Sequence, residues 1–360
     1  MKVQLNSPLI PNSEKLKEYI DVINNRGWLT NFGPLHDELK DRLEDYLGVK
    51  NLLLLSSGTS ALQVAGKALD VNKVLTTPFS FVATSSAFLW QGTPVEYADI
   101  DINSYNLSPV SIEKKLEDGQ FEENSSVVAT HVYGNPCDVL EMQRISDKYG
   151  VKLIYDAAHA FGVNIGDQSV FNFGDASILS FHATKVFNTV EGGGIVFKNN
   201  DDYELALDLI NFGIRKRVGV TSVGVNAKMS EYHAAVGLCN LDVIDDVILH
   251  RVDMYGLYKK LLGDYVKFPH WHPDANHNGA YLPVILENCD LDVLVRYMES
   301  NGVGVRRYFY PLITDEYKMT EIYRNSKYIS QRILCLPLHA YMSKRDVEYV
   351  SKVLLKGISV

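Results

Sequence analysis

The sequence predicts an α/β protein with a largely parallel sheet, followed by a smaller α+β domain at the C-terminus. Two observations carry this prediction. Short apolar runs typical of buried strands alternate with amphipathic helical periods over roughly the first 240 residues. After Leu241-Asp242 the pattern changes to one long helix and a turn-rich stretch. We therefore expect a large α/β domain over residues 1–242 and a small α+β domain over residues 243–360.

The large domain is predicted from two interleaved sets of segments. Apolar runs typical of buried strands lie at residues 51–55, 73–77, 126–130, 152–155 and 176–180. Amphipathic helical periods lie at residues 35–47, 61–69, 139–149 and 201–212. Strands that alternate with helices predict a mostly parallel sheet with helices on its faces.

The small domain shows a different order of elements. A long helix is expected over residues 243–262, and the turn-rich aromatic stretch Phe268-Pro269-His270-Trp271-His272-Pro273 follows it. A strand at residues 280–286 and helices at residues 291–301 and 343–356 complete the domain. No flexible linker stands before the long helix, so this helix itself is expected to join the two domains.

The composition is that of a soluble globular protein. The chain has 360 residues, of which 46% are hydrophobic and 22% are charged, and its formal net charge is −9. This acidic balance argues against a nucleic-acid partner, because phosphate backbones reward clustered Lys and Arg. No apolar run approaches the roughly 20 residues that cross a bilayer, and the first residues lack the apolar core of a signal peptide. We expect a cytoplasmic protein without a membrane partner.

The four cysteines are scattered along the chain, at Cys137, Cys239, Cys289 and Cys335. They form no CxxC pair, so neither a disulfide framework nor a zinc site is indicated. We expect reduced, structural thiols and no metal.

A candidate phosphate site follows the first predicted strand, in Ser56-Ser57-Gly58-Thr59-Ser60. A buried strand that ends in small residues directly before a helix presents free N–H groups and the positive end of the helix dipole to an anion. Gly58, Thr59 and Ser60 are the candidate contacts. The lysine of a P-loop is absent, and no GxGxxG indicates a dinucleotide fold. A simple helix cap is the alternative interpretation.

A second strand-to-helix turn lies at Thr77-Pro78-Phe79-Ser80-Phe81-Val82-Ala83-Thr84. Ligands of α/β proteins bind at the C-terminal edge of the parallel sheet, where Phe81 could lie flat against an aromatic cofactor ring. A phenylalanine of the core is the alternative. Asp156 follows the strand at 152–155 and is expected in the same crevice, with His159 three residues further along a new helix.

The most informative pair of residues is Asp156 with Lys185, in Ser180-Phe181-His182-Ala183-Thr184-Lys185. A lysine that can form a Schiff base, with an upstream aspartate that can bind a pyridinium nitrogen, is the minimum equipment of a pyridoxal-phosphate (PLP) enzyme. Lys185 would also be the base that moves a proton at the substrate carbon. Ser180 and His182 stand where a hydroxyl could bind the cofactor phosphate and an imidazole could orient it.

Several motifs in chain order extend this pattern over nearly the whole sequence. They are Trp28-Leu29-Thr30-Asn31-Phe32-Gly33-Pro34, Ser57-Gly58-Thr59-Ser60-Ala61-Leu62, His131-Val132-Tyr133-Gly134, Asp156-Ala157-Ala158-His159-Ala160, the run that ends at Lys185, Glu191-Gly192-Gly193, Asn211-Phe212-Gly213 and Leu336-Pro337-Leu338-His339. With these motifs the chain closely resembles the DegT-type sugar aminotransferases, fold-type I PLP enzymes that act on nucleotide-linked keto-sugars.

The resemblance implies a homodimer with the active site at the subunit interface, where Asn226 reaches the cofactor phosphate of the other subunit. It implies L-glutamate as the amino donor, and we assign Thr30 and Asn31 to substrate binding. Related sugar 3-dehydratases carry histidine at the Schiff-base position, whereas this chain keeps Lys185. The resemblance therefore favours amino transfer.

Three segments resemble enzymes that make dTDP-4-amino-4,6-dideoxyglucose from dTDP-4-keto-6-deoxyglucose. They are Val305-Arg306-Arg307-Tyr308-Phe309-Tyr310-Pro311-Leu312, Asn135-Pro136-Cys137-Asp138 and Phe187-Asn188-Thr189-Val190-Glu191. Arg306 and Tyr310 are assigned to the substrate. The pyrophosphate is expected to meet a basic side chain, either from the 215–217 run or Arg306. Amination at carbon 3 of a dTDP-3-keto-6-deoxyhexose is the alternative. The resemblance also implies an O-antigen of lipopolysaccharide, or another surface glycan, as the destination.

A regulatory or binding module that has lost catalysis is the alternative from a different class. The intact Lys185, Asp156 and helix-start loop weigh against it, because a pure binder has no need for a free base at that position.

Overall fold

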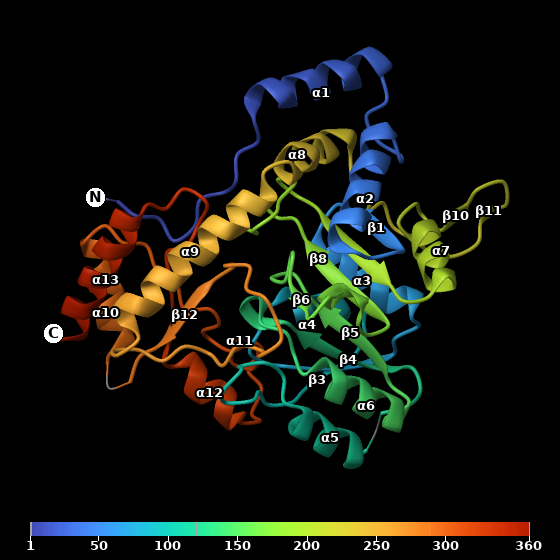
Figure 1. The fold of residues 1–360 in the computed structure, drawn as a ribbon. Coiled ribbons are helices and arrows are strands. Elements are labelled where there is room, and N and C mark those ends of the chain that lie inside the picture. The colour runs from blue at the N-terminus through green and yellow to red at the C-terminus, as the bar shows by residue number, and fades with distance from the viewer. Residues whose placement is uncertain (1, 120, 288, 360) are drawn as a thin grey trace.

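The computed structural model describes residues 2–119, 121–287 and 289–359. Within them, a seven-stranded sheet in the order β1-β9-β8-β5-β4-β2-β3 lies at the centre of the large domain (Figure 1). Its strands are β1 (Leu52–Leu55), β2 (Lys73–Thr76), β3 (Val95–Tyr97), β4 (Ser125–Thr130), β5 (Lys152–Asp156), β8 (Ala176–Ser180) and β9 (Gly193–Phe197). The strands from β8 through β5, β4 and β2 to β3 are parallel, whereas β9 is antiparallel to both β8 and β1. The predicted, largely parallel sheet is confirmed.

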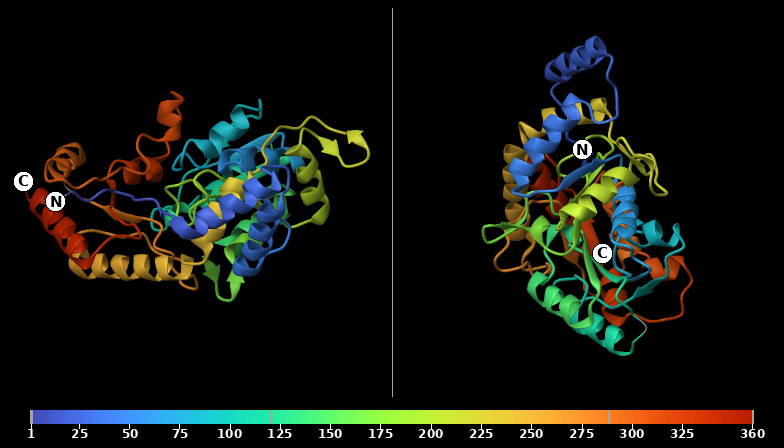
Figure 2. Two further views of the ribbon diagram at one scale, coloured as in Figure 1. Left: turned by 90° about the horizontal axis from the view of Figure 1, so that it is seen from above. Right: turned by 90° about the vertical axis from the view of Figure 1, so that its right-hand side faces the viewer.

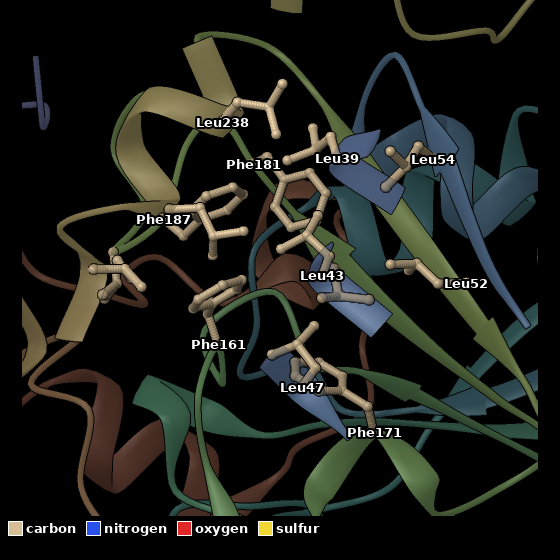
Figure 3. Close-up of a cluster of buried hydrophobic side chains, with 14 of the residues drawn as sticks. Leu39, Leu43, Leu47, Leu52, Leu54, Phe161, Phe171, Phe181, Phe187 and Leu238 are labelled. Atoms are coloured by element: carbon tan, nitrogen blue, oxygen red, sulfur yellow. The ribbon is translucent and has the colours of Figure 1, made fainter. Parts of the chain in front are cut away.

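Helices cover both faces of this sheet, and strand β1 shows why its sequence is uniformly apolar. Leu52 and Leu54 join a core with helices α2 and α8 (Figure 3), and Leu53 and Leu55 join a core with α3 on the opposite face. The large-domain helices are α1 (Ser13–Arg26), α2 (Pro34–Leu47), α3 (Gly58–Ala68), α4 (Ala83–Leu89), α5 (Pro109–Glu117), α6 (Val139–Tyr149), α7 (Asn200–Leu209) and α8 (Glu231–Leu241), with 3-10 turns η1 (Val132–Gly134) and η2 (Val170–Asn172).

The small domain packs three helices against a two-stranded antiparallel sheet. Helix α9 (Ile244–Leu262) runs from the large domain into it, as two views show (Figures 1 and 2). The strands are β12 (Leu282–Ile285) and β13 (Ile333–Leu336), and the helices are α9, α10 (Leu291–Ser300) and α13 (Lys344–Ile358), with the short α11 (Ile313–Glu316) and α12 (Arg324–Ser330) between. Val3 of the N-terminal segment pairs with Val303 and is buried in this same core.

Two small hairpins project from the large domain. They are β6 (Asn164–Ile165) with β7 (Gln168–Ser169), and β10 (Ile214–Arg215) with β11 (Gly219–Val220). The second hairpin carries the basic run 215–217 at its tip and stands clear of the domain (Figure 2).

Local chemistry explains where several helices begin. The side chain of Asn12 accepts hydrogen bonds from the N–H groups of Glu14 and Lys15 at the start of α1. Ser108 caps α5 ahead of Pro109, and Ser343 forms a capping box with Asp346 at the start of α13.

Some elements were not predicted, and one expectation is wrong. No helix follows Asp156: residues 157–163 form turns, closed by hydrogen bonds from Ala160 N to Ala157 O (2.9 Å) and from Val163 N to Ala160 O (3.0 Å). Helix α8 escaped prediction because almost all of its residues are buried, which leaves no polar face to mark a helical period. Helices α1 and α5 and strands β3 and β13 were also not predicted.

Candidate active site

A cavity of about 350 Å³ lies where four strands of the large sheet end. Its floor includes Ser80 beyond β2, Thr130 at the end of β4, Asp156 at the end of β5 and Ser180 at the end of β8. The opposite wall comes from the small domain, through Tyr281, Arg306, Tyr308 and Phe309. The carboxyl edge of a parallel sheet is the usual ligand site of α/β folds. The cavity therefore lies between the domains, where groups from both can reach one ligand.

The start of helix α3 forms an anion cradle at one end of this cavity. The Ser57 hydroxyl accepts a hydrogen bond from Ser60 N (3.0 Å), which fixes the first turn of the helix. The N–H groups at the start of a helix have no partner within that helix, so those of Gly58 and Thr59 can bind an anion. The expected helix cap is thus present, and it leaves the neighbouring N–H groups of Gly58 and Thr59 directed to the cavity end of the helix.

Close backbone approach shapes this cradle. A Cβ on Gly193 would lie 2.5 Å from the carbonyl carbon of Ser57 and 2.6 Å from Gly58 N. A Cβ on Gly58 would lie 3.0 Å from the Cβ of Ser180. Strand β9 can therefore pass beside the helix start only because glycine stands at position 193.

Asp156 presents a carboxylate that is held firmly. Its side chain is 6% exposed, and Oδ2 accepts a hydrogen bond from the hydroxyl of Thr84 (2.6 Å). Oδ1 accepts a longer one from Ala158 N (3.3 Å). The hydroxyl of Ser80 lies 2.8 Å from that of Thr84 and 3.0 Å from that of Thr130, so a buried chain of hydroxyls supports the carboxylate.

Lys185 follows a tight turn in which its N–H donates to His182 O (2.8 Å). Burial of the amine lowers the pKa of Lys185 to about 8, and the charge of Asp156 opposes this shift. A lysine with such a pKa is partly neutral near physiological pH, and the neutral amine is the form that acts as a nucleophile and a base. The side-chain amide of Asn6 donates to Thr184 O (2.6 Å), so the N-terminal segment holds the turn.

His159 lies on the cavity wall as a neutral ring. Its Nδ1 accepts a hydrogen bond from Tyr133 N (3.1 Å), and its ring centroid lies 4.7 Å from that of Tyr281. Burial, and secondarily the charge of Lys185, keep the pKa of His159 well below its ordinary value. Because Nδ1 is an acceptor, the ring proton is assigned to Nε2.

The structure brings most of the sequence-predicted residues to this cavity. Those that line it are Gly58, Thr59, Phe81, Asp156, His159, Ser180, His182, Lys185 and Arg306. Ser60 belongs to the same helix start and bonds to Ser57. Phe81 is 56% exposed, so it is a wall residue and not one of the core.

The remaining candidates lie elsewhere on the chain. Thr30 and Asn31 are exposed on the segment between α1 and α2, and Asn226 is exposed beside Asn211. Tyr310 lines a neighbouring surface pocket, with the guanidinium of Arg307 at 3.5 Å from its ring centroid.

Some residues of the cavity were missed from the sequence. Thr84 stands in the segment singled out for Phe81, but nothing local marks it as the partner of Asp156. Tyr281, Tyr308 and Phe309 reach the cavity from the small domain, which shows no signal for a site apart from its resemblance to known enzymes. Across residues 2–119, 121–287 and 289–359, no cluster of three His, Cys, Asp or Glu side chains suits a metal ion. No helix in these ranges is long and apolar enough to span a bilayer.

A lysine of lowered pKa, a buried carboxylate and an anion cradle around one cavity define the class of PLP-dependent enzymes. Comparisons with known proteins agree. Residues 11–355 match the model of the DegT/DnrJ/EryC1/StrS aminotransferase family, and the chain belongs to this family. It is a PLP-dependent sugar aminotransferase.

Two similar proteins carry the same name, dTDP-4-amino-4,6-dideoxy-D-glucose transaminase. The one from Shigella dysenteriae is 37% identical, with 96% of each chain covered, and the one from Escherichia coli is 34% identical, with 98% of each covered. Among solved structures, DesI in the presence of its TDP-sugar product is 29% identical with a TM-score of 0.93, and the match covers 99% of this chain and 93% of that one.

Proposed function

We propose that this enzyme moves the amino group of L-glutamate onto carbon 4 of dTDP-4-keto-6-deoxyglucose, which gives dTDP-4-amino-4,6-dideoxyglucose. The observation that carries the proposal is the likeness, over nearly the whole chain, to two transaminases named for that product. The cavity supports it, because Lys185 and Asp156 both line its free space.

The residues of the cavity suit PLP, and we propose these roles for them. The N–H groups of Gly58 and Thr59, with the hydroxyls of Ser60 and Ser180, hold the phosphate. Bound PLP supplies a protonated pyridine ring that accepts electrons from the substrate carbon, and it does so only beside a fixed anion. The carboxylate of Asp156 is placed for that nitrogen, since Thr84 and Ala158 N leave it no freedom to turn away.

Three further side chains complete the proposed cofactor site. Phe81 and His159 would lie against the cofactor ring, and His182 would orient the phosphate end of the cofactor. A neutral His159 brings no second positive charge to a pocket that already holds Lys185. Lys185 Nζ would be the base that takes and returns the proton at the reacting substrate carbon.

We infer that the active enzyme is a homodimer. Thr30, Asn31 and Asn226 lie outside the cavity of their own chain, and large apolar side chains are exposed near them: Trp28, Leu29, Phe212, Val223 and Val225. Exposed apolar clusters of this kind mark interfaces. In the proposed dimer, Asn226 reaches the cofactor phosphate of the other subunit, and Thr30 and Asn31 contact the substrate.

Mixing two inactive variants tests the dimer. Lys185→Ala and Asn226→Ala chains, refolded together, should regain about a quarter of wild-type turnover, because about half of the dimers are mixed and each mixed dimer holds one intact site. Each variant alone, treated in the same way, is the control. If the mixture is no more active than the variants alone, Asn226 does not act across an interface.

We further propose that the enzyme works in the cytoplasm and that its amino sugar enters an O-antigen of lipopolysaccharide or another surface glycan. These points rest on the resemblance to enzymes of surface-glycan synthesis. The pyrophosphate of the substrate would meet either the 215–217 run or Arg306, and Tyr310 lies beside the latter.

A spectrum of the holoenzyme tests the reaction itself. The absorbance band of bound PLP should disappear on addition of L-glutamate and return on addition of dTDP-4-keto-6-deoxyglucose, and NMR should place the new nitrogen at carbon 4. Nitrogen at carbon 3, or cycling with a 3-keto sugar only, would instead establish the alternative substrate. A spectrum that does not respond to L-glutamate would overturn the proposed amino donor.

A further inference from the structure

Two adjacent arginines in the small domain, Arg306 and Arg307, differ in the number of polar partners that their side chains have. Arg307 donates to Asp292 Oδ1 (2.8 Å) and, at 3.3 and 3.4 Å, to the carbonyl oxygens of Ser330 and Gln331. Its guanidinium also covers the ring of Tyr310. The two terminal nitrogens of Arg307 are therefore engaged in holding its own segment together.

Arg306 has none of these partners. Within the described part of the chain, its side chain forms no hydrogen bond or ion pair, and its guanidinium carbon lies 5.3 Å from the ring centroid of Tyr308. Its backbone, in contrast, is fixed to strand β13: Cys335 N donates to Arg306 O (2.7 Å) and Arg306 N donates to Cys335 O (3.2 Å). A free guanidinium thus stands on an anchored backbone at the cavity wall.

The other basic side chains of the cavity are committed. Lys185 must leave its amine free to react, and His159 is neutral because burial lowers its pKa. His182 lies with Nδ1 at 2.9 Å from the Thr184 hydroxyl and Nε2 at 3.7 Å from a carboxylate oxygen of Glu191. Among the described residues that line the cavity, Arg306 is the one permanently charged cation without an anionic partner.

The amino donor creates a need for such a cation. The α-carboxylate of an amino acid is bonded to the carbon that Lys185 must deprotonate, so it has to enter the same cavity. A carboxylate that leaves water without a partner is costly, and a planar guanidinium is the group that pairs with it by two hydrogen bonds. We propose that Arg306 binds a carboxylate of the amino donor; this rests on the proposed function, and deepens it.

The two half-reactions test this assignment separately. In Arg306→Gln, the L-glutamate concentration that gives half the maximal rate of cofactor amination should rise about 10- to 100-fold, with a smaller change in the limiting rate. Arg306→Lys should recover only part of the loss, because an ammonium keeps the charge without the two-pronged geometry. Arg345→Gln, which removes an exposed charge from α13 of the same domain, away from the cavity and from the pocket that Tyr310 lines, is the matched control and should behave as wild type.

The outcomes separate this proposal from the one it rests on. If wild type responds to L-glutamate and Arg306→Gln responds with the same half-saturation, the carboxylate assignment is wrong and the proposed function stands. If only the nucleotide-sugar half-reaction is weakened, Arg306 contacts the diphosphate and the carboxylate assignment is again wrong. If wild type itself does not respond to L-glutamate, both proposals fail. An unchanged absorbance spectrum of bound PLP and an unchanged melting temperature confirm that each variant is folded.

Discussion

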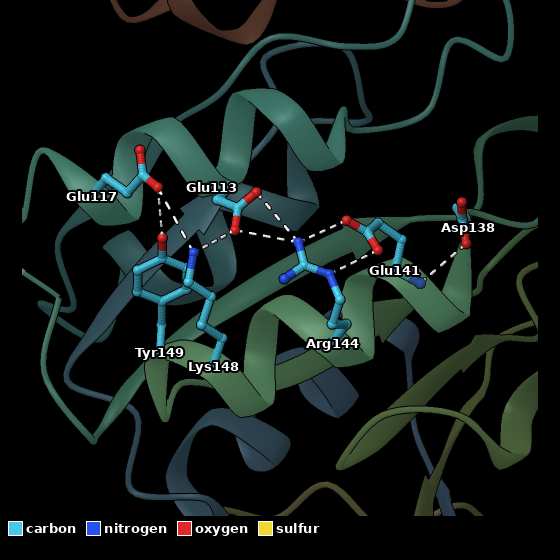
Figure 4. A network of polar contacts seen from close by, with 7 residues as sticks. All are labelled: Glu113, Glu117, Asp138, Glu141, Arg144, Lys148 and Tyr149. Atoms are coloured by element: carbon cyan, nitrogen blue, oxygen red, sulfur yellow. Dashed lines mark hydrogen bonds and ion pairs between the residues drawn. The ribbon is translucent and has the colours of Figure 1, made fainter.

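The cavity floor and the surface between α5 and α6 both carry polar networks, but of different kinds. On the floor, Asp156 has two hydrogen-bond partners and is almost fully buried. On the surface, Arg144 pairs with Glu113 and Glu141, and Lys148 pairs with Glu113 at 2.8 Å (Figure 4). The surface network has more ion pairs, yet water reaches all of them.

The difference shows that the contribution of a polar contact to stability and function depends on its burial and not on the number of contacts around it. Exposed ion pairs are screened by solvent and salt, and they add little to stability. Hydrogen bonding to Lys148 and then to Arg144 lowers the pKa of Glu113, but that group lies at the surface, where solvent screens it. A buried carboxylate supported by a few hydroxyls keeps its direction where the chemistry needs it.

Removal of the reactive amine should have the largest effect. We expect Lys185→Ala to lower turnover by about 10³-fold or more, because the nucleophile and the base are lost together. Lys198→Ala, an exposed lysine on the same domain, should keep full activity. Steady-state rates and the absorbance of bound PLP measure both. Substantial turnover in Lys185→Ala would favour another base. Partner binding that is equal in wild type and Lys185→Ala, with no turnover in either, would favour the binding-module alternative.

Loss of the buried charge comes next. Asp156→Asn should leave the fold intact and slow transamination by about 10²- to 10³-fold, since the ring nitrogen loses its anionic partner. Thr84→Val removes the 2.6 Å hydrogen bond to Asp156 and the 2.8 Å contact with the Ser80 hydroxyl but keeps the charge of Asp156, so a loss of several-fold is expected. Near-normal rates in Asp156→Asn would show that this carboxylate does not serve the cofactor.

Two glycines differ in the space that an added Cβ would find: Gly193 lies against backbone atoms, whereas Gly256 faces open space. In Gly193→Ala the new methyl group would meet the backbone of Ser57 and Gly58, and we expect a loss of about 1–3 kcal/mol in stability together with weaker PLP binding. Gly256→Ala, in helix α9 with nothing within 4 Å of the added Cβ, should be neutral or stabilising by up to about 1 kcal/mol. Thermal unfolding and PLP titration check the pair. Equal behaviour of the two variants would mean that the helix start can move aside.

The capture of PLP by the cofactor-free protein should depend on pH. The pKa of Lys185 is lowered to about 8, and only the neutral amine forms the covalent bond. We expect the rate to rise about tenfold per pH unit below pH 8 and to level off above it. The same shift makes the folded state bind fewer protons than the unfolded chain between about pH 8 and the ordinary lysine value of 10.5, so stability should rise across that window and be independent of this group below it. A rate that is flat from pH 6.5 to 9 would contradict the assignment.

The surface network should show the smallest effect. Arg144→Ala breaks every contact of Arg144 in Figure 4, yet we expect turnover to stay at the wild-type level and the melting temperature to move less than in Gly193→Ala. Any small shift should vanish in about 1 M salt. A large loss of stability would show that the exposed network contributes more than its solvent contact allows.

The sequence predicted the central sheet well and its surroundings less well. Strands β1, β2, β4, β5 and β8 were found because each is a short apolar run bounded by turn residues. Helix α8 was missed because almost all of its residues are buried, and a helix was wrongly expected after Asp156 because Asp followed by two alanines is typical of a helix start. In both cases tertiary contacts, which local patterns do not contain, decided the outcome.

In the candidate site, too, some residues could be predicted from the sequence and others could not. Lys185, Asp156 and the small residues before α3 were visible in the sequence, since each stands at the end of a predicted strand or beside a predicted helix. Thr84, Tyr281 and Phe309 were not, because their contribution depends on a neighbour far away in the chain.

The sequence by itself determined the chemical groups of this enzyme and the alternation of its strands and helices, because residue type and hydrophobic period are local properties. Only the tertiary structure decided which groups meet: that Gly193 passes beside Ser57, that burial lowers the pKa of Lys185, and that Arg306 faces the cavity while Arg307 is engaged by Asp292. Those outcomes depend on burial and on contacts between distant segments, which form only when the whole chain has packed.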